Sequence, residues 1–512
     1  MNNRFMLGLD IGTSGVKGLL IDEKGKTITS AFAGYPLFTP KPTWIEQNPE
    51  DWWEATVKVI KEIVENPLVK REQIAGIGFS GQMHSLVLLG KNDEVLRPAI
   101  LWSDTRTDEE CRQINQLIGL DVLRRTTANP AIEGFTLPKL LWVQKHEPQV
   151  YEKINRIFLP KDFIRFKLTG ECGMEVSDAS GTILYDVCAR KWSDGILKQF
   201  SIPKSWLSPV FESIDVCGKI SQDALKLTGL PVGIPVAGGG GDNSCGAIGA
   251  GVIHEGQMLA GIGTSGIVLA PINNVRVDPE MRVHTFCHSV PHRWYAMGVM
   301  LMAGGALRWY KDTFAQAEVE QARSSNRDVY DVITEGAAKI SPGSEGLYFQ
   351  PYLAGERTPH RSANARAAFI GATLRHTKNH FSRAVLEGVT YGMRDSLEII
   401  KKLGIQIGQI RLTGGGAKSA FWRQLQANIY GSEVAIVGTT EGSAYGAALL
   451  GGTASGVFGS IEEAVNQTVS ITERIQPDVS LIRQYDDYYG IYSKIFPNLK
   501  ESYASIRKTF TN

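Results

Sequence analysis

The sequence predicts an α/β protein made of two domains that share one plan. Its 512 residues are more than a single hydrophobic core usually serves. Apolar, strand-like runs alternate with helical patterns along the chain, which indicates a mixed α/β architecture. The tetrapeptide Gly-Thr-Ser-Gly occurs at 12–15 and again at 263–266, each time between two strand-like runs. This repeat predicts one domain over residues 1–250 and a second over residues 251–512, with a cleft between them.

The composition is that of an ordinary globular protein, with 43% apolar and 21% charged residues. A formal net charge of +1 gives no reason to expect a nucleic acid or an anionic membrane as a partner. The six cysteines are scattered and form no CxxC pair, which is typical of reduced cytosolic thiols. No apolar run is long enough to span a membrane, and the first residues lack the apolar stretch of a signal peptide. We therefore expect a cytoplasmic location.

The amino-terminal region predicts a three-stranded meander followed by a helix. Residues 5–10 and 16–22 are apolar runs separated by the first GTSG turn, and a third run follows a second turn. The helix is expected in "QNPEDWWEATVKVIKEIVENP", because Asn48 is a good N-cap and Pro49 suits the first helical position. Its apolar stripe is predicted to consist of Trp53, Val57, Ile60 and Val64.

A polar loop is expected in "IAGIGFSGQMHSLVLLG", between two strands. The loop carries Gln82, Met83 and His84. Polar side chains beside an apolar wall suit a polyhydroxylated ligand, although a lone histidine is more often structural. A second polar cluster, with Trp102 and Asp104, follows another apolar run, and its role stays open.

Each GTSG turn can present several backbone N–H groups to phosphate oxygens, or can be a simple β-turn. Asp10 ends the strand before the first turn, whereas Gly261 stands at the equivalent place before the second. A carboxylate beside bound phosphate requires a cation, so a hydrated Mg²⁺ is expected at Asp10. Only the first domain is then expected to hold the metal.

A third glycine cluster, Gly414 to Gly416, ends a strand and opens a helix. This turn can receive an adenine or an α-phosphate, or can be an ordinary strand-to-helix connection. The GxxxxGK spacing of a Walker A loop is absent.

Asp242 follows four glycines in "VAGGGGDNSCGAIGAG" and precedes a helix of small residues. Because glycine lets backbone and ligand approach closely, the carboxylate is a candidate catalytic base in an open loop. The alternative is a helix N-cap.

Motifs along nearly the whole chain resemble those of the FGGY carbohydrate kinases. The matching stretches are "LGLDIGTSGVKGLLID", "WIEQNPEDWW", "GQMH", "LRPAILWSDTRT", "EGFTLPKLLWVQKHE", "LPKDFIRFKLTG", "SDASGT", "GGGDN", the second "GTSG", "PYLAGERTPH", "TGGGAKSAFWRQ" and "GSAYGAALLGG". The resemblance implies two ribonuclease H-like domains of the actin and hexokinase ATPase type, flanking a cleft. It agrees with the internal repeat.

The resemblance also implies roles for individual residues. Asp242 is implied as the catalytic base that accepts the proton of the sugar hydroxyl, and Asp10 as the Mg²⁺ site, through water. The sugar-binding residues are implied to be Gln82, Met83, His84, Trp102, Asp104, Asp242 and Asn243. The nucleotide-binding residues are implied to be Gly12, Thr13, Ser14, Lys17, Gly263, Thr264, Ser265, Gly415, Gly416 and Ala417.

The implied reaction is phosphoryl transfer from ATP to a sugar, with Mg²⁺ as cofactor. The GQMH sequence is typical of the branch that phosphorylates D-xylulose at O5; another ketopentose, a pentitol or gluconate are the alternatives. A small-molecule sugar is the expected partner, and a homodimer is common among such kinases. A more remote alternative is an ATPase assembly module of the actin or Hsp70 kind, which needs no sugar pocket.

Overall fold

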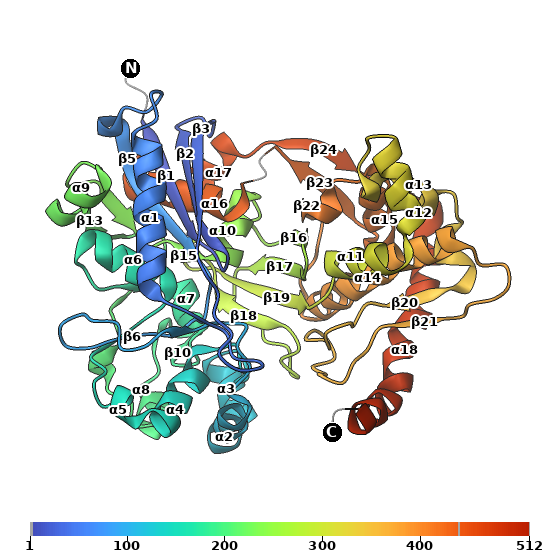
Figure 1. Ribbon diagram of the computed structural model, residues 1–512, viewed down its shortest axis with the longest axis horizontal. Coiled ribbons are helices and arrows are strands. Elements are labelled where there is room, and N and C mark those ends of the chain that lie inside the picture. The colour runs from blue at the N-terminus through green and yellow to red at the C-terminus, as the bar shows by residue number, and fades with distance from the viewer. Residues whose placement is uncertain (1–3, 439–440, 511–512) are drawn as a thin grey trace.

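The computed structural model describes residues 4–438 and 441–510 and shows two lobes, each a twisted sheet flanked by helices (Figure 1). The first lobe is coloured blue to green, and the second is mainly yellow to red. This mixed α/β, two-domain arrangement confirms the predicted fold class.

The first sheet has the strand order β13-β14-β5-β1-β2-β3, and β15 also pairs with β5. Its strands are β1 (Phe5–Ile11), β2 (Gly15–Asp22), β3 (Thr27–Gly34), β5 (Ile74–Gly81), β13 (Val216–Lys219), β14 (Pro235–Ala237) and β15 (Gly240–Gly241). β1 is antiparallel to β2 and parallel to β5. The first three strands form the expected meander.

The second sheet repeats this plan, in the order β18-β19-β17-β16-β22-β23-β24. Its strands are β16 (Gln257–Ile262), β17 (Gly266–Ile272), β18 (His284–Cys287), β19 (Trp294–Met300), β22 (Gln409–Gly414), β23 (Glu433–Val437) and β24 (Ile471–Ile475). β16 is antiparallel to β17 and parallel to β22, as β1 is to β2 and β5. The two GTSG turns therefore connect equivalent strands, which confirms that the two halves share one plan.

Helix α1 (Pro49–Val64) begins as expected, because Oδ1 of Asn48 accepts a hydrogen bond from the Glu50 N–H. Its buried side differs in part from the expected stripe, since Val57 and Val64 are only partly buried. The fully buried residues of this face are Trp52, Thr56, Val59, Ile60 and Ile63. The shift follows from the sheet beneath, where Gly18 of β2 leaves room for the side chains of Val59 and Ile63.

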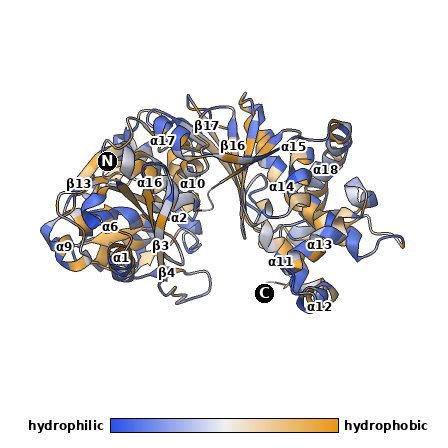
Figure 2. Cartoon of the chain, turned by 90° about the horizontal axis from the view of Figure 1, so that it is seen from above, coloured by the Kyte–Doolittle hydropathy of each residue, from blue (hydrophilic) through white to orange (hydrophobic). Residues whose placement is uncertain are grey.

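Helix α16 (Gly442–Ala454) belongs to the second half of the sequence but packs on the first sheet. In Figure 1 it lies among the blue strands, and in Figure 2 its label stands in the left-hand lobe beside α10. The contact is backbone to backbone: a Cβ on Gly8 would lie 2.0 Å from the Ala444 carbonyl oxygen, and one on Gly78 would lie 1.8 Å from that of Ala447. Small residues in both elements thus join the halves closely.

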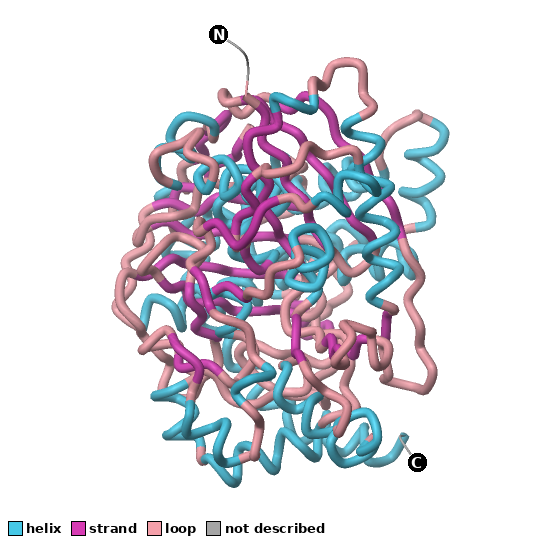
Figure 3. The backbone as a smooth tube through the Cα atoms, turned by 90° about the vertical axis from the view of Figure 1, so that its left-hand side faces the viewer, coloured by secondary structure: helices cyan, strands magenta, loops and turns pink. Residues whose placement is uncertain are grey.

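The other helices lie around the two sheets, and in Figure 3 a group of them lies at the bottom, below most of the magenta strands. They are α2 (Asp108–Ile118), α3 (Leu120–Thr126), α4 (Thr136–His146), α5 (Pro148–Tyr151), α6 (Pro160–Thr169), α7 (Val176–Ser180), α8 (Asp194–Gln199), α9 (Gln222–Thr228), α10 (Asp242–Gly249), α11 (Gly304–Phe314), α12 (Gln316–Ser324), α13 (Val329–Ala338), α14 (Lys378–Lys402), α15 (Ala420–Tyr430), α17 (Ile461–Thr468) and α18 (Val479–Phe510). Among the described helices, none combines the length and apolarity that a membrane crossing would need.

Short elements complete the chain. They are β4 (Glu46–Gln47), β6 (Val87–Leu89), β7 (Ala99–Ile100), β8 (Arg156–Phe158), β9 (Met174–Glu175), β10 (Tyr185–Asp186), β11 (Lys191–Trp192), β12 (Val210–Phe211), β20 (Tyr348–Gln350), β21 (Ala368–Ile370), and the 3₁₀ turns η1 (Arg71–Gln73), η2 (Lys204–Trp206), η3 (Pro342–Gly346) and η4 (Gly415–Ala417). All six cysteines are free thiols, as their spacing predicted.

Candidate active site

Asp242 is the first residue of α10 and follows β15 at the carboxyl end of β5. Its Oδ1 accepts hydrogen bonds from the backbone N–H (2.8 Å) and the side-chain amide (2.9 Å) of Asn243. A capping side chain would instead bond the second or third N–H beyond it, and no side chain caps this end of α10. Oδ2 accepts no hydrogen bond from a described residue. The contacts thus favour a reactive carboxylate over a structural cap.

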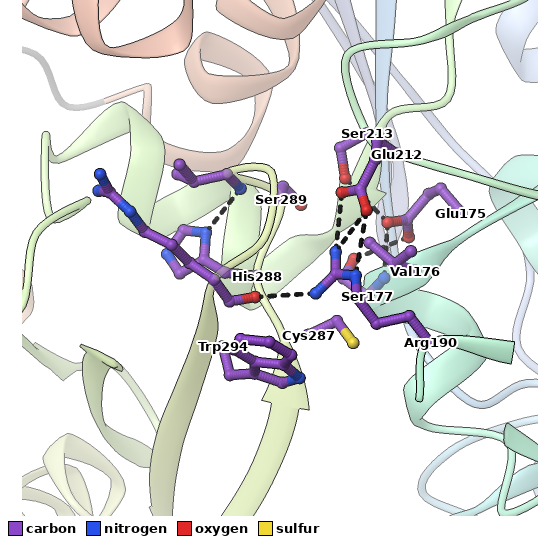
Figure 4. Close-up of polar contacts among 12 residues, drawn as sticks. Glu175, Val176, Ser177, Arg190, Glu212, Ser213, Cys287, His288, Ser289 and Trp294 are labelled. Carbon is purple, nitrogen blue, oxygen red and sulfur yellow. Dashed lines mark hydrogen bonds and ion pairs between the residues drawn. The ribbon is translucent and has the colours of Figure 1, made fainter. Parts of the chain in front are cut away.

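The residue before Asp242 is held by a buried polar network, and Figure 4 shows its members Glu175, Ser177 and Ser213. The Gly241 N–H donates to Oγ of Ser177 (2.9 Å), and that hydroxyl donates to the Glu175 carboxylate (2.7 Å). Ser213 donates to the second oxygen of the same carboxylate (2.9 Å), and Lys161 forms an ion pair with it (3.2 Å). The backbone that carries Asp242 is therefore held in place by Ser177 and, through it, by Glu175.

The second half of the chain also supports α10. Oγ of Ser244 accepts a hydrogen bond from the Ser289 N–H (2.8 Å), at the end of the β18–β19 hairpin. Figure 4 shows the same hairpin joined to the first half by Arg190, which is ion-paired with Glu212 (2.7 Å) and donates to the Arg293 carbonyl (3.2 Å). Asp242 thus lies where the two halves meet.

Two carboxylates approach each other at this point. Burial and the nearby Asp10 carboxylate raise the pKa of Asp242 to about 7. Burial also raises the pKa of Asp10, while the Ser80 hydroxyl and the positive charge of Lys17 oppose that rise. Oδ1 of Asp10 is buried and accepts no hydrogen bond from a described residue. A pair of carboxylates with one unsatisfied oxygen suits a hydrated divalent cation.

The first GTSG turn is tied to the polar loop by side chains. The Trp102 indole N–H donates to Oγ1 of Thr13 (2.9 Å), and the Gln47 amide donates to the Thr13 carbonyl (2.7 Å). The Gln82 amide donates to Oε1 of Gln47 (3.2 Å). Trp102 is 38% exposed, so its ring is available to a ligand. Gln82 is buried and serves this network.

Gln47 was not expected from the sequence as part of the site. It lies in "WIEQNPEDWW", directly before the helix cap Asn48. A polar side chain at that position does not indicate which distant residues it will contact. In the structure its amide is fully buried and also accepts a hydrogen bond from the Trp52 indole N–H (3.0 Å). The Tyr35 hydroxyl, which donates to the Gly12 carbonyl, was missed in the same way.

Met83 lies against Gly241, next to Asp242, and His84 follows it in the loop. A Cβ on Gly241 would lie 2.8 Å from Sδ of Met83, which explains why glycine precedes the carboxylate. Nδ1 of His84 lies 3.0 Å from the Gly181 carbonyl, and its ring packs 4.5 Å from that of Phe135. Burial lowers the pKa of His84 to about 3, so the imidazole is neutral.

A buried lysine that the sequence did not single out fixes this loop. Nζ of Lys139 donates to the carbonyls of His84 (3.0 Å) and Gly134 (2.5 Å). Burial lowers the pKa of Lys139 to about 7. Its backbone partners mark it as a residue that positions the loop.

Asp104 was expected to contact the sugar, but the structure gives both of its oxygens protein partners. Oδ2 accepts from the Ile45 N–H (2.6 Å), and the Arg106 guanidinium donates to both oxygens (2.7 and 3.0 Å). Asp104 and Arg106 are both almost fully buried, and Arg106 also pairs with Glu46 (2.8 Å). Asp104 thus holds the turn that carries Trp102, and its direct contact with the sugar stays a prediction.

Lys17 was expected on the nucleotide side, and it lies opposite Asp10 in the β1–β2 ladder. Its ammonium group forms an ion pair with Glu441, just before α16. Ser14 of the same turn is exposed. Both remain candidates for phosphate contact.

The second GTSG turn borders a cavity of about 310 Å³. The N–H groups of Gly304 and Gly305 donate to the carbonyls of Gly263 (2.8 Å) and Thr264 (3.0 Å), so the amino terminus of α11 is locked onto the turn. The cavity is lined by Gly263, Thr264, Gly304, Arg308, Asp328, Gly415, Gly416, Lys418 and Trp422, among others. Ser265 and Ala417, also expected there, are not among the lining residues.

The third glycine cluster lies directly beside this turn. β22 ends at Gly414, and η4 (Gly415–Ala417) precedes α15, as the sequence predicted. A Cβ on Gly414 would lie 2.5 Å from the Ile262 carbonyl oxygen, so only glycine fits. The cavity therefore combines glycine backbone with two cations, Arg308 and Lys418, which suits a phosphorylated ligand.

Comparisons with known proteins agree with this geometry. Residues 5–249 match the N-terminal domain, and residues 258–455 the C-terminal domain, of the FGGY family of carbohydrate kinases. A xylulose kinase of Staphylococcus epidermidis is 41% identical over 512 residues, which cover all of both chains.

Solved structures give the same result. A ligand-bound xylulose kinase from Lactobacillus acidophilus has a TM-score of 0.91 and 27% identity, covering 98% of this chain and 100% of its own. A gluconate kinase from the same organism also has a TM-score of 0.91 and 27% identity, covering 99% of this chain and 100% of its own. The chain therefore belongs to the FGGY family of carbohydrate kinases.

Proposed function

We propose that this kinase transfers the γ-phosphoryl group of ATP to O5 of D-xylulose, giving D-xylulose 5-phosphate, with Asp242 as the catalytic base. One observation carries the proposal: a carboxylate with a pKa near 7 and a free Oδ2 lies beside the Met83–His84 loop. The GQMH sequence of that loop and the xylulose kinases among the similar proteins support D-xylulose as the acceptor.

In the proposed reaction, Oδ2 of Asp242 accepts the proton of the sugar hydroxyl as the hydroxyl oxygen attacks the γ-phosphorus. The bond from the γ-phosphorus to the β,γ-bridging oxygen breaks, and that oxygen leaves as part of ADP. Asn243 keeps the carboxylate oriented through its two hydrogen bonds to Oδ1. Phosphoryl transfer depends mainly on positioning and charge neutralisation, so the rigid support below Gly241 is part of the chemistry.

The nucleotide is proposed to lie in the cavity beside the second GTSG turn. Thr264, Gly415 and Gly416 line that cavity, and Arg308 and Lys418 can face the phosphates. Asp10 would hold Mg²⁺ through water, and the ion would neutralise charge on the β- and γ-phosphate oxygens. Gly12, Thr13, Ser14 and Lys17 are proposed to face the same phosphates from the first half. We also propose that the kinase is a homodimer and that it is located in the cytoplasm.

Gluconate is a second candidate acceptor. The similar gluconate kinase structure supports this acceptor, because its fold matches this chain as well as that of the xylulose kinase does. Gluconate carries a carboxylate that D-xylulose lacks, so the two acceptors are distinguished by assay and not by fold.

The test measures ADP release with MgATP and a panel of D-xylulose, D- and L-ribulose, L-xylulose, xylitol, glycerol and gluconate. Asp242→Asn is assayed alongside, and Asp223→Asn is the matched control, since Asp223 stands exposed in the first turn of α9. Removing a general base is expected to lower kcat on the order of 10²- to 10⁴-fold. The control is expected to keep wild-type activity.

Each outcome decides between the alternatives. Preference for D-xylulose, lost in Asp242→Asn, supports both substrate and base. Preference for gluconate, with the same loss of activity in Asp242→Asn, supports Asp242 as the base and changes only the proposed acceptor. Full activity of Asp242→Asn would overturn the catalytic base.

A further inference from the structure

Arg357 lies in the second half, in the connection between β20 and β21, where its backbone is firmly held. Oε1 of the buried Glu356 accepts hydrogen bonds from the N–H groups of Leu301 (3.0 Å) and Arg357 (2.6 Å). Thr358 and Val299 exchange two hydrogen bonds (3.0 and 3.1 Å), which attach the connection to β19. The base of the Arg357 side chain is therefore a rigid part of the second half.

The guanidinium group reaches the first half at the sugar loop. Its Nη2 lies 3.7 Å from the position that a Cβ on Gly134 would take, and the Trp102 carbonyl oxygen lies 2.8 Å from the same position. The next residue, Phe135, packs its ring 4.5 Å from that of His84. The Arg357 guanidinium, the Trp102 carbonyl and, through Phe135, the His84 ring thus lie around Gly134, although they come from three distant parts of the sequence.

The guanidinium is partly buried, but it donates no hydrogen bond to a described residue. Among the described residues, none forms a hydrogen bond or an ion pair with the Arg357 side chain, whereas Arg106 of the same region is paired with two carboxylates. Burial lowers the pKa of Arg357 more than the nearby carboxylates of Glu133 and Glu356 raise it. The charge of Arg357 also contributes to the lowered pKa values of His84 and Lys139. A fork of N–H donors in a partly dry site calls for acceptor oxygens from a ligand.

We infer that Arg357 binds the sugar from the second half of the molecule, donating hydrogen bonds to sugar oxygens that Trp102 and His84 face from the first half. This inference rests on the proposed function, because it concerns the acceptor pocket of that kinase. The pocket is then complete only when both halves contribute, so sugar binding favours the approach of the halves. Arg357 is a substrate-binding residue that determines affinity for the acceptor.

The test compares wild type with Arg357→Met, Arg357→Lys and the control Arg361→Met. Arg361 lies in the same connection and is exposed, with Asp278 as its nearest opposite charge. Loss of one or two charge-assisted hydrogen bonds is expected to raise the KM for the sugar on the order of 10- to 100-fold in Arg357→Met. Arg357→Lys keeps the charge and is expected to lie between Arg357→Met and wild type.

The KM for ATP is the second readout, because a structural defect would disturb both substrates. It is expected to stay within about twofold of wild type in every variant, since Arg357 is not among the residues that line the nucleotide cavity. An unchanged sugar KM in Arg357→Met, or an equal rise in Arg361→Met, overturns the inference and leaves the kinase activity standing. If wild type turns over no sugar of the panel, the proposed function fails first. Should Arg357→Met not fold, Arg357→Lys decides by the same sugar KM.

Discussion

The two GTSG turns have the same four residues but different geometry. In the first, Ile11 pairs with Val16, so all four residues lie outside the β1–β2 ladder. In the second, Ile262 pairs with Gly266, so the last glycine joins the ladder and only three residues form the turn. The last glycine of each turn has different neighbours: a Cβ on Gly266 would lie 2.3 Å from Sδ of Met393, and a Cβ on Gly15 would lie 2.5 Å from the Phe32 ring. Identical local sequence does not fix a turn when packing differs.

The surroundings of the two turns differ in the same way. Side chains of Gln47, Tyr35 and Trp102 hold the first turn, and all of them come from the region around the sugar loop. Backbone N–H groups of α11 hold the second turn, beside the nucleotide cavity. The two halves thus carry similar turns with different partners. We propose that the first turn serves the acceptor and the metal, and that the second serves the nucleotide.

The largest expected difference between the turns concerns Asp10 and its counterpart Gly261. Asp10→Asn is expected to lower kcat on the order of 10²- to 10³-fold, because the proposed Mg²⁺ site loses its carboxylate. Gly261→Ala is expected to cost far less, since its Cβ would meet only Ile267 and Thr413 side-chain atoms at 3.1 Å. The measurement is kcat at saturating substrates over a Mg²⁺ titration. Equal losses in the two variants would contradict the assignment.

Gly304→Ala tests the second turn. Its Cβ would lie 2.4 Å from the Gly263 carbonyl oxygen, so the turn must move. We expect the KM for ATP to rise on the order of tenfold, while the KM for the sugar changes little. Gly490→Ala is the control, because its Cβ would meet no atom within 4 Å. A rise confined to the sugar KM would reverse the assignment of the turns.

Trp102→Phe tests the first turn more gently, because it removes the hydrogen bond to Thr13 and keeps an aromatic ring. The KM for the sugar is expected to rise about 3- to 10-fold, with little change for ATP. Trp206→Phe serves as the control, since Trp206 packs against Tyr151, far from the turn in the sequence. Steady-state kinetics with each substrate varied in turn gives both constants. An equal effect on both substrates would remove the distinction.

The smallest expected effect is a shift in pH dependence. Asp242 must be ionised to accept a proton, so kcat/KM for the sugar should rise with pH through a limb near pH 7. Asp10→Asn removes the like charge that helps to raise this pKa, so its limb should lie at lower pH. Rate measurements between about pH 5 and 9 test this. A limb at the same pH in Asp10→Asn and in wild type would show that the two carboxylates do not interact.

Much of the fold could be predicted because its signals are local. The meander, the capped helix at Asn48 and the glycine turn after β22 follow from turn residues and apolar periodicity, and the structure confirms them. The position of α16 could not be predicted. Its small residues indicate that another element packs closely against it, but they do not indicate which element that is. The boundary near residue 250 remains a prediction, and α16 crosses it in space.

The candidate site divides in the same manner. The sequence by itself determined the repeated turns, the family motifs and the glycines before Asp242, because these are written in neighbouring residues. Only the tertiary structure decided that Asp10 lies near Asp242, that Asp104 forms an ion pair with Arg106, and that Arg357 reaches Gly134. These facts join residues far apart in the chain, and their pKa shifts and free hydrogen-bond donors arise from burial that exists only when both halves are folded together.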